Sequence, residues 1–363
     1  MNTLNHPALP HRQNRSRQFF RAVRKHRLHL AMILPVMCWY LLFRYVPLYG
    51  ITLAFKDFQL LRGNLHTHTV VSDGHYDLEQ TAFFYGKNCT YKRNPRMNYR
   101  FLAITDHTTD AKRELFRRPE TTEDGFILIE GREDSYSHHI LGIGCPMTFQ
   151  EDIVGKPKGT YTLEDNQRVI DKILEDGGIA VLAHPHWASQ DYWTCDDARN
   201  LQGYTGIEII NGDVFSGPGN LATDVWDAAL TAGKRVWGLG NDDFHSVRDF
   251  HHAWNMALCR EETAEGVLEA LRHGSLYVSN GASFESIIAD GEWIVAACHP
   301  DSLFTDVEKT FRFISQGGQV RQVQTGKNRI AAYKAQGDEQ YIRVELSLSW
   351  GMAAFSQPFF RED

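Results

Sequence analysis

The sequence has few long hydrophobic runs, and after Phe55 it has none. A protein that crosses a membrane several times needs about 20 mostly apolar residues for each helix, so this absence excludes a multi-span transporter. Internal repeats and low-complexity tracts are also missing, which excludes repeat architectures. With 42% hydrophobic and 23% charged residues among 363, the composition is that of a folded globular protein.

The cysteines lack any C-x-x-C pair or other short spacing. A zinc site built from thiolates needs such pairs, so the sequence argues against one. Scattered cysteines favour reduced, buried thiols and a reducing compartment, although an even number leaves disulfides open. The six residues are Cys38, Cys89, Cys145, Cys195, Cys259 and Cys298.

Acidic residues are absent before Asp57, whereas residues 1–27 hold seven lysines and arginines. The net charge of −7 therefore hides a basic tail, residues 1–27, followed by 31 basic and 45 acidic residues with a net charge of −14. Binding to duplex nucleic acid needs clustered cations, which this acidic body does not offer. The body is better suited to a site that binds cations.

One hydrophobic segment covers residues 28–55, and within it Ala31 to Phe43 are all apolar. Thirteen residues are too few for a span, but extension past Arg44 to Phe55 gives the length that a membrane helix needs. We predict a membrane helix here, with the basic tail on the cytoplasmic side. The alternatives are a signal-peptide core or an amphipathic surface element, and without a true span the protein would be cytoplasmic.

The same segment is similar to the first membrane helix of sugar-type ABC transporter permeases, through the string LPVMCWYLLFRYVPLYGITLAFKDF. This resemblance covers about 30 residues. A permease needs several further spans, so transport is not implied. It does leave open a membrane-tethered accessory module of a transporter.

From Arg62 onward, short apolar strands alternate with helical stretches. The predicted strands lie in RGNLHTHT, YRFLAITDH, GFILIEG, GGIAVLAHPH, GIEIING and KRVWGLGNDD, and the predicted helices at 162–175, 221–232 and 262–272. This alternation predicts an α/β protein with a parallel barrel over residues 61–281 and a site at the carboxyl ends of its strands. Alternating runs with glycine turns predict a small antiparallel β-rich appendage over residues 282–363.

Candidate metal ligands follow several predicted strands. In NLHTHTVVSDG, His66 and His68 lie two residues apart, so both side chains point to one face of an extended segment. Four more motifs place His, Asp or Glu near strand ends: FLAITDHT, IEGREDSYSHHILGIG, IAVLAHPHW and VWGLGNDDFH. Each motif alone is common, because histidines occur in solvated loops and aspartates cap helices and turns. Five in order, without a thiolate, favour a site for zinc, manganese or iron.

Taken together, these motifs resemble the successive motifs of the PHP (polymerase and histidinol phosphatase) family over about residues 62–281. The resemblance implies a distorted (β/α)7 barrel that holds two or three divalent metal ions, Mn, Zn or Fe. It implies that Glu133 bridges two of them. The implied ligands are His66, His68, Glu133 and Asp243 for the first metal, His139 and His184 with Glu133 for the second, and Asp73, His107 and His245 for the third.

The family pattern also decides between neighbouring candidates. It selects Glu133 over Glu130 and His139 over His138. The D-x-H of the last motif selects Asp243 over Asp242. Asp242 would then contact the metal ligands without binding a metal itself.

The expected activity is the hydrolysis of phosphate esters, with a small phosphoester, a nucleotide or an oligonucleotide end as substrate. A hydroxide held by two ions would attack phosphorus, while the cations offset the charge that develops on the phosphoryl oxygens. His186 and Glu208 are candidate catalytic residues that would assist a leaving group or orient a ligand. The alternatives are a carboxylic or carbamate ester hydrolase and a catalytically silent transporter module. The sequence does not indicate an oligomeric state.

Overall fold

The computed structural model describes residues 58–86, 98–136, 138–149, 161–187, 189, 191–212, 221–290, 292–300 and 306–361. The predicted basic tail and the hydrophobic segment 28–55 lie outside these residues. Of the helices in the described ranges, none is both long enough and apolar enough to cross a bilayer. The four described cysteines, Cys145, Cys195, Cys259 and Cys298, are free thiols.

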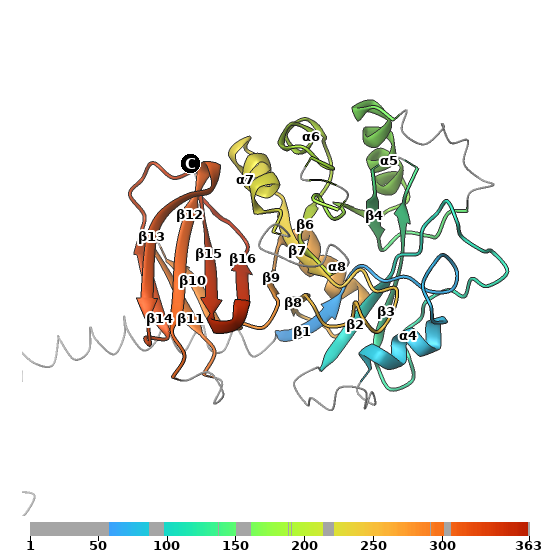
Figure 1. Cartoon of the computed structure of the whole chain (residues 1–363), viewed down its shortest axis with the longest axis horizontal. Helices are drawn as coiled ribbons and strands as arrows, with labels where there is room; N and C mark the ends of the chain where they lie inside the picture. The colour runs from blue at the N-terminus through green and yellow to red at the C-terminus, as the bar shows by residue number, and fades with distance from the viewer. Residues whose placement is uncertain are drawn as a thin grey trace, which may run out of the picture. The chain divides into compact units, whose positions relative to one another are not determined.

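A mixed sheet forms the framework of the part that begins at Gln59 (Figure 1). Two parallel groups lie within it. The first is β1 (Gln59–Asn64), β2 (Tyr99–Ile104) and β3 (Ile127–Asp134), and the second is β5 (Ile179–Leu182), β6 (Gly206–Asn211) and β7 (Trp237–Asn241). Between them β4 (Ile140–Ile143) runs antiparallel to both neighbours, and beyond β1 lie the antiparallel strands β8 (Trp254–Cys259) and β9 (Leu276–Ser279).

The six predicted strand motifs are confirmed by β1, β2, β3, β5, β6 and β7. The residues of β2, β5 and β6 are mostly apolar and, apart from the half-buried Arg100, buried, as expected of strands covered on both faces. The antiparallel β4 was not predicted, because four buried apolar residues carry no signal of strand direction.

The helices of this part are α4 (Leu78–Tyr85), α5 (Leu163–Glu175), α6 (Cys195–Asn200), α7 (Thr223–Thr231) and α8 (Ala264–His273). The three predicted helices correspond to α5, α7 and α8 within two residues at each end. Thr162 begins α5 with a capping box, in which its side chain accepts from the Asp165 N–H and the Asp165 carboxylate accepts from the Thr162 N–H. At the end of α8, Gly274 adopts φ of 66°, a left-handed conformation that glycine accepts readily.

The predicted (β/α)7 barrel is not confirmed, because the hydrogen-bonded strands do not form a closed ring in the described residues. In the described residues the strand order ends at β7. Side chains and a short bridge connect β7 to β1 and β8 instead: Asn255 bonds both the N–H and the C=O of Gly240, and Asn241 accepts from the Leu65 N–H at 2.9 Å. Past the strand ends, Thr67 and Phe244 form a parallel bridge. The segments that follow β1 and β7, which carry predicted ligands, are therefore adjacent.

The C-terminal region is antiparallel and β-rich, as predicted (Figure 1). Its strands are β10 (Phe284–Asp290), β11 (Trp293–Cys298), β12 (Lys309–Ser315), β13 (Gln319–Gly326), β14 (Ile330–Lys334), β15 (Tyr341–Leu348), β16 (Ala353–Ser356) and β17 (Phe359–Phe360), with 3-10 turns at Gln316–Gly318 and Ser349–Gly351. A three-stranded sheet, β10-β11-β14, packs on β12 and β15 through buried side chains such as Phe313, Tyr333 and Val344.

The main sheet continues from one predicted domain into the other. Strand β16 pairs with β9, with Phe355 opposite Val278. The two parts also meet where the Arg343 guanidinium on β15 makes two hydrogen bonds to the Asp227 carboxylate on α7, at 2.8 and 2.7 Å. The residues from Gln59 onward form one compact unit, and the boundary at 281/282 stays a prediction.

Candidate metal centre

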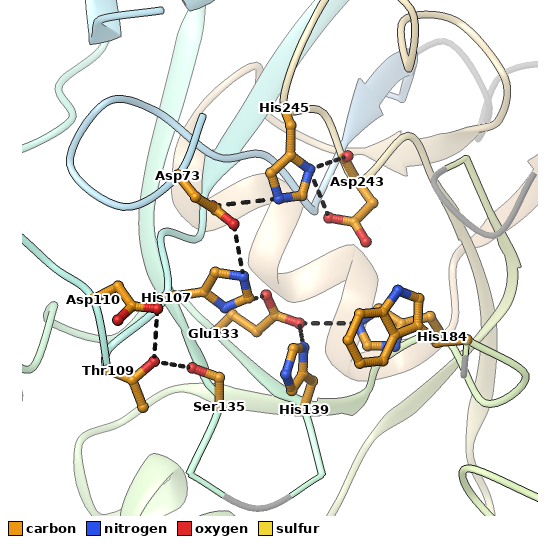
Figure 2. A pocket seen from close by; sticks show the side chains of 11 residues that line it. Asp73, His107, Thr109, Asp110, Glu133, Ser135, His139, His184, Asp243 and His245 are labelled. Carbon is orange, nitrogen blue, oxygen red and sulfur yellow. Dashed lines mark hydrogen bonds and ion pairs between the residues drawn. The ribbon is translucent and has the colours of Figure 1, made fainter. Parts of the chain in front are cut away.

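Glu133 lies at the centre of the candidate site, fully buried on β3 (Figure 2). Its two carboxylate oxygens lie within 3.3 Å of a ring nitrogen from each of five histidines. These distances are 3.3 Å to His66, 3.3 Å to His68, 2.9 Å to His107, 2.8 Å to His139 and 3.1 Å to His184. The histidines come from the segments after β1, β2 and β5 and from just before β4, so distant parts of the chain converge on one carboxylate.

Asp243, in the segment after β7, forms the second anionic contact of the cluster. Its Oδ1 lies 3.1 Å from His66 Nε2 and 3.0 Å from His68 Nε2. Asp243 has a φ of 52° and His184 a φ of 30°, both in a region that L-residues rarely adopt. Such strain persists where surrounding contacts hold it, and it concentrates at functional sites.

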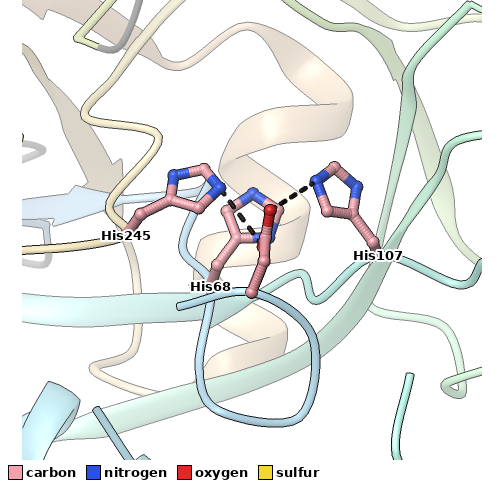
Figure 3. A group of neighbouring side chains, drawn as sticks. His68, His107 and His245 are labelled. Atoms are coloured by element: carbon pink, nitrogen blue, oxygen red, sulfur yellow. Dashed lines mark ion pairs between the residues drawn. The ribbon is translucent and has the colours of Figure 1, made fainter. Parts of the chain in front are cut away.

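Asp73 and His245 complete the set, and Figure 3 shows the His245 ring close to those of His68 and His107. The Asp73 carboxylate lies 3.3 Å from His245 Nε2, 3.6 Å from His107 Nε2 and 3.7 Å from His68 Nδ1, and its side chain is half-exposed. The rings of His68 and His245 stack with centroids 4.1 Å apart.

The structure thus brings all nine predicted ligands together. They form four overlapping groups, in each of which one nitrogen or oxygen atom per residue lies within 4.8 Å of the others. The groups are His68, Asp73, His107 and His245; His66, His184 and Asp243; His66, His68 and Glu133; and His107, Glu133 and His139.

The hydrogen bonding of these side chains fits metal ions. Seven of the nine present a buried atom that makes no hydrogen bond, although other ligand atoms lie close by. A buried polar atom without a partner costs about 1–3 kcal/mol, so seven in one cluster would be a heavy cost unless cations satisfy them. The atoms are His66 Nε2, His68 Nε2, His107 Nδ1, Glu133 Oε2, His139 Nδ1, His184 Nδ1 and Asp243 Oδ1.

Glu208 is a buried carboxylate that holds two of the predicted ligands, His66 and His184, through hydrogen bonds. Its Oε1 accepts from His66 Nδ1 at 2.9 Å and Asn241 Nδ2 at 2.7 Å, and its Oε2 accepts from the His184 N–H and Asn211 Nδ2, both at 2.8 Å. Four donors occupy this carboxylate, so it fixes the ring of His66 with Nε2 toward Asp243. Of the two roles predicted for Glu208, these contacts favour orienting a ligand.

We therefore expect Glu208→Gln to weaken Mn²⁺ or Zn²⁺ binding about 10- to 100-fold, because the amide would present N–H groups to donors that now face a carboxylate. Competition with a chelating dye measures this affinity. Glu130→Gln is the matched control: Glu130 is also on β3 but bonds Arg118 and the Met147 N–H instead of the cluster. Equal affinity in the two variants would contradict the role of Glu208.

Protonation opposes metal binding at this site. Burial lowers the pKa of His107, but Glu133 and Asp73 more than reverse this effect and raise it to about 9. Burial also lowers the pKa of His245, and Asp73 and Asp243 raise it to about 9. Both imidazoles therefore carry a proton at pH 7 in metal-free protein, and a metal can bind only their neutral forms.

We expect Mn²⁺ or Zn²⁺ binding at pH 7 to release protons, and the apparent affinity to fall as the pH drops below about 9. Titration calorimetry in two buffers of different ionisation enthalpy measures the number of protons released. Identical heats in the two buffers would show that His107 and His245 are already neutral.

The family pattern selected Asp243 over Asp242 and His139 over His138, and both of the residues not selected make hydrogen bonds elsewhere. Asp242 accepts hydrogen bonds from the Tyr85 hydroxyl and from the backbone N–H groups of residues 251–253, so it fixes that loop. His138 contacts Asn166 through Nδ1.

His186 contacts Asp224 on α7 at 3.0 Å and is not among the residues that line the site cavity. A catalytic role for His186 stays a prediction.

Two supporting residues, Asp106 and Asn241, were not among the predicted ligands or catalytic residues. Asp106 accepts from the backbone and hydroxyls of Thr69 and Ser72 and so holds the turn that carries His68 and Asp73. Asn241 follows the same rule as the ligands, a polar residue at the end of an apolar strand, and that signal could have identified it.

The cluster lies at the bottom of a cavity of about 400 Å³, a size typical of small-molecule sites. Seven of its eleven lining residues are predicted ligands, and four others complete the wall. The lining consists of Asp73, His107, Thr109, Asp110, Glu133, Ser135, His139, His184, Trp187, Asp243 and His245.

No family model matches the chain, and no curated protein matches its sequence. Among solved structures, the chain is similar to a two-domain protein from Bacteroides vulgatus that contains a predicted PHP-like metal-dependent phosphoesterase. The TM-score is 0.46 at 16% sequence identity, and the match covers 81% of this chain and 91% of that one. The function of this chain is therefore inferred from the geometry of its own site.

Proposed function

We propose that the protein is a metal-dependent hydrolase of phosphate esters with a small-molecule or nucleotide substrate. The observation that carries this proposal is the cluster of six histidines and three carboxylates, gathered around Glu133 at the bottom of a cavity. Imidazole and carboxylate ligands without thiolates suit Mn, Zn or Fe, and the set is large enough for two or three ions.

The predicted division among metals is one way to share these ligands, although the four groups overlap across it, since His184 also lies near His66 and Asp243, and His107 near Glu133 and His139. His66, His68, Glu133 and Asp243 would hold one ion, Glu133 with His139 and His184 a second, and Asp73, His107 and His245 a third. Bound divalent ions would supply a Lewis acid that makes water nucleophilic near neutral pH and offsets charge on a phosphoryl group.

The chain itself positions the substrate beside this cluster. Thr109 and Ser135 lie on the cavity wall with their hydroxyls 2.8 Å apart, and either can donate to a phosphoryl or leaving-group oxygen. Buried Glu208 keeps the His66 ring in one orientation. The turn held by Asp106 keeps His68 and Asp73 in place.

The experiment uses the full chain, purified without added metal, and combines elemental analysis with a panel of phosphate, carboxylate and carbamate esters. We expect bound Mn, Zn or Fe, phosphate-ester hydrolysis, loss of activity with a chelator and recovery with added metal. A protein that binds no metal and stays inactive when Mn²⁺ or Zn²⁺ is supplied would instead favour the silent transporter module, tethered through residues 28–55.

One observation favours a second candidate, hydrolysis of carboxylic or carbamate esters. In the described lining of the cavity, no lysine or arginine is present to pair with a phosphate. A neutral ester needs no such cation, and the same metal-activated water can attack carbon. Activity confined to carboxylate or carbamate esters would replace the phosphate proposal with this one.

A further inference from the structure

Trp187 is an exposed aromatic side chain in a polar cavity. It follows the predicted ligand His184 by three residues, and its ring lies 5.3 Å from that of His184 and 5.2 Å from that of His139, centroid to centroid. Tyr192 packs against it at 5.5 Å with the rings nearly perpendicular. Although these contacts fix its position, 42% of Trp187 remains accessible, and the residue lines the cavity.

The rest of the wall is polar and differs in character. Besides Trp187, only Thr109, Asp110 and Ser135 among the described lining residues are not predicted ligands. Thr109 contacts both of the other two, at 2.8 Å to the Ser135 hydroxyl and 3.4 Å to the Asp110 carboxylate. Within the described lining, the part of a substrate beyond the ester group therefore lies either against the Trp187 ring or against Thr109, Asp110 and Ser135. Figure 2 shows the side chains of Thr109, Asp110 and Ser135 next to one another.

The charge of this wall limits which chemical groups the substrate can carry beyond the ester. Asp110 disfavours an anionic group beyond the ester, and no lysine or arginine in the described lining opposes it. An aliphatic group could fill the space, but it would gain only burial. A planar aromatic ring gains burial and stacking on an indole whose position is already fixed.

We propose that Trp187 is a specificity-determining residue that stacks on a planar aromatic ring of the substrate, so that the site prefers esters of aromatic compounds. This inference rests on the proposed phosphoesterase function. The ring lies apart from the reacting phosphorus, so stacking stabilises the bound substrate and the transition state equally. Its loss should raise KM and leave kcat unchanged.

The test compares benzyl phosphate with cyclohexylmethyl phosphate, whose leaving groups are both primary alcohols and differ in the aromatic ring. For the wild-type chain we expect a lower KM for benzyl phosphate. Trp187→Ala should raise that KM roughly tenfold while changing the KM for cyclohexylmethyl phosphate little, and Trp187→Phe should restore the preference. Trp293→Ala is the matched control, since Trp293 on β11 is 48% exposed and does not line the cavity.

Elemental analysis of each variant separates stacking from damage to the neighbouring ligands His139 and His184. Equal KM values for the two esters in the wild-type chain, or an equal rise for both in Trp187→Ala with metal retained, would overturn the inference and leave the proposed function standing. Hydrolysis of neither ester by the metal-loaded wild type would count against the phosphoesterase proposal itself.

Discussion

Replacing His66 with alanine is expected to lower kcat by roughly a thousandfold, equivalent to about 4 kcal/mol of lost transition-state stabilisation. His66 belongs to two of the four ligand groups and contacts both Glu133 and Asp243. Its removal takes away a ligand shared within the cluster and leaves Glu208 without one of its donors. Asp243→Ala should have an effect of similar size, because Asp243 contacts His66 and His68 through a single oxygen.

Steady-state kinetics on the preferred ester measures this loss, and circular dichroism checks that each variant keeps the native secondary structure. His75→Ala is the matched control, since His75 is an exposed histidine in the same segment as His68 and Asp73. If His66→Ala or Asp243→Ala lowers kcat by no more than about threefold relative to wild type, the site assignment is refuted.

Replacing Asp227 with alanine is expected to lower the free energy of unfolding by about 3–5 kcal/mol. The Arg343 guanidinium is almost fully buried and makes two hydrogen bonds to Asp227, to which the Tyr341 hydroxyl also donates. Without Asp227, the carboxylate that Arg343 still contacts in the described part of the chain is that of Glu345. Removing one partner of a buried ion pair costs far more free energy than the intact pair contributes, because the other charge stays buried without compensation.

Urea denaturation measures the change. The double variant Asp227→Ala/Arg343→Met should recover much of the loss, since it removes the buried charge together with its partner. Arg168→Ala, which breaks an exposed pair with Glu164 on α5, should change stability little. A loss in the double variant as large as in Asp227→Ala alone would show that packing, and not the unpaired guanidinium, causes the effect.

The convergence of the ligands was predictable because it follows from strand geometry. His66 and His68 point to one side of an extended segment, and the carboxyl ends of neighbouring parallel strands meet at one edge of a sheet. Apolar strands ending in Asp106, His107 and Asp243 therefore had to bring polar side chains together. The choice of Glu133 over Glu130 came from the family pattern, and the buried position of Glu133 among five histidines agrees with it.

What the sequence could not predict depends on contacts between distant residues. The sequence analysis did not single out Trp187, because its place on the cavity wall depends on packing against His139, 48 residues earlier in the chain. Glu208 carried no mark that distinguishes a supporting carboxylate from a catalytic one, since that depends on the donors around it. The predicted boundary at 281/282 likewise gave no sign that β16 would pair with β9.

The pairing of β16 with β9 has a consequence for any shortened form of the chain. A cut at residue 281 would remove β16 from one side of β9, so that the N–H and C=O groups of Tyr277 to Ser279 on that side lose their partner strand, while β8 remains on the other side. It would also uncover Val278 and Tyr277, which are buried in the full chain and belong to clusters that contain C-terminal residues. Such an open apolar edge invites pairing with another molecule, so the isolated N-terminal part should self-associate and precipitate, whereas the chain that keeps β16 should stay monodisperse.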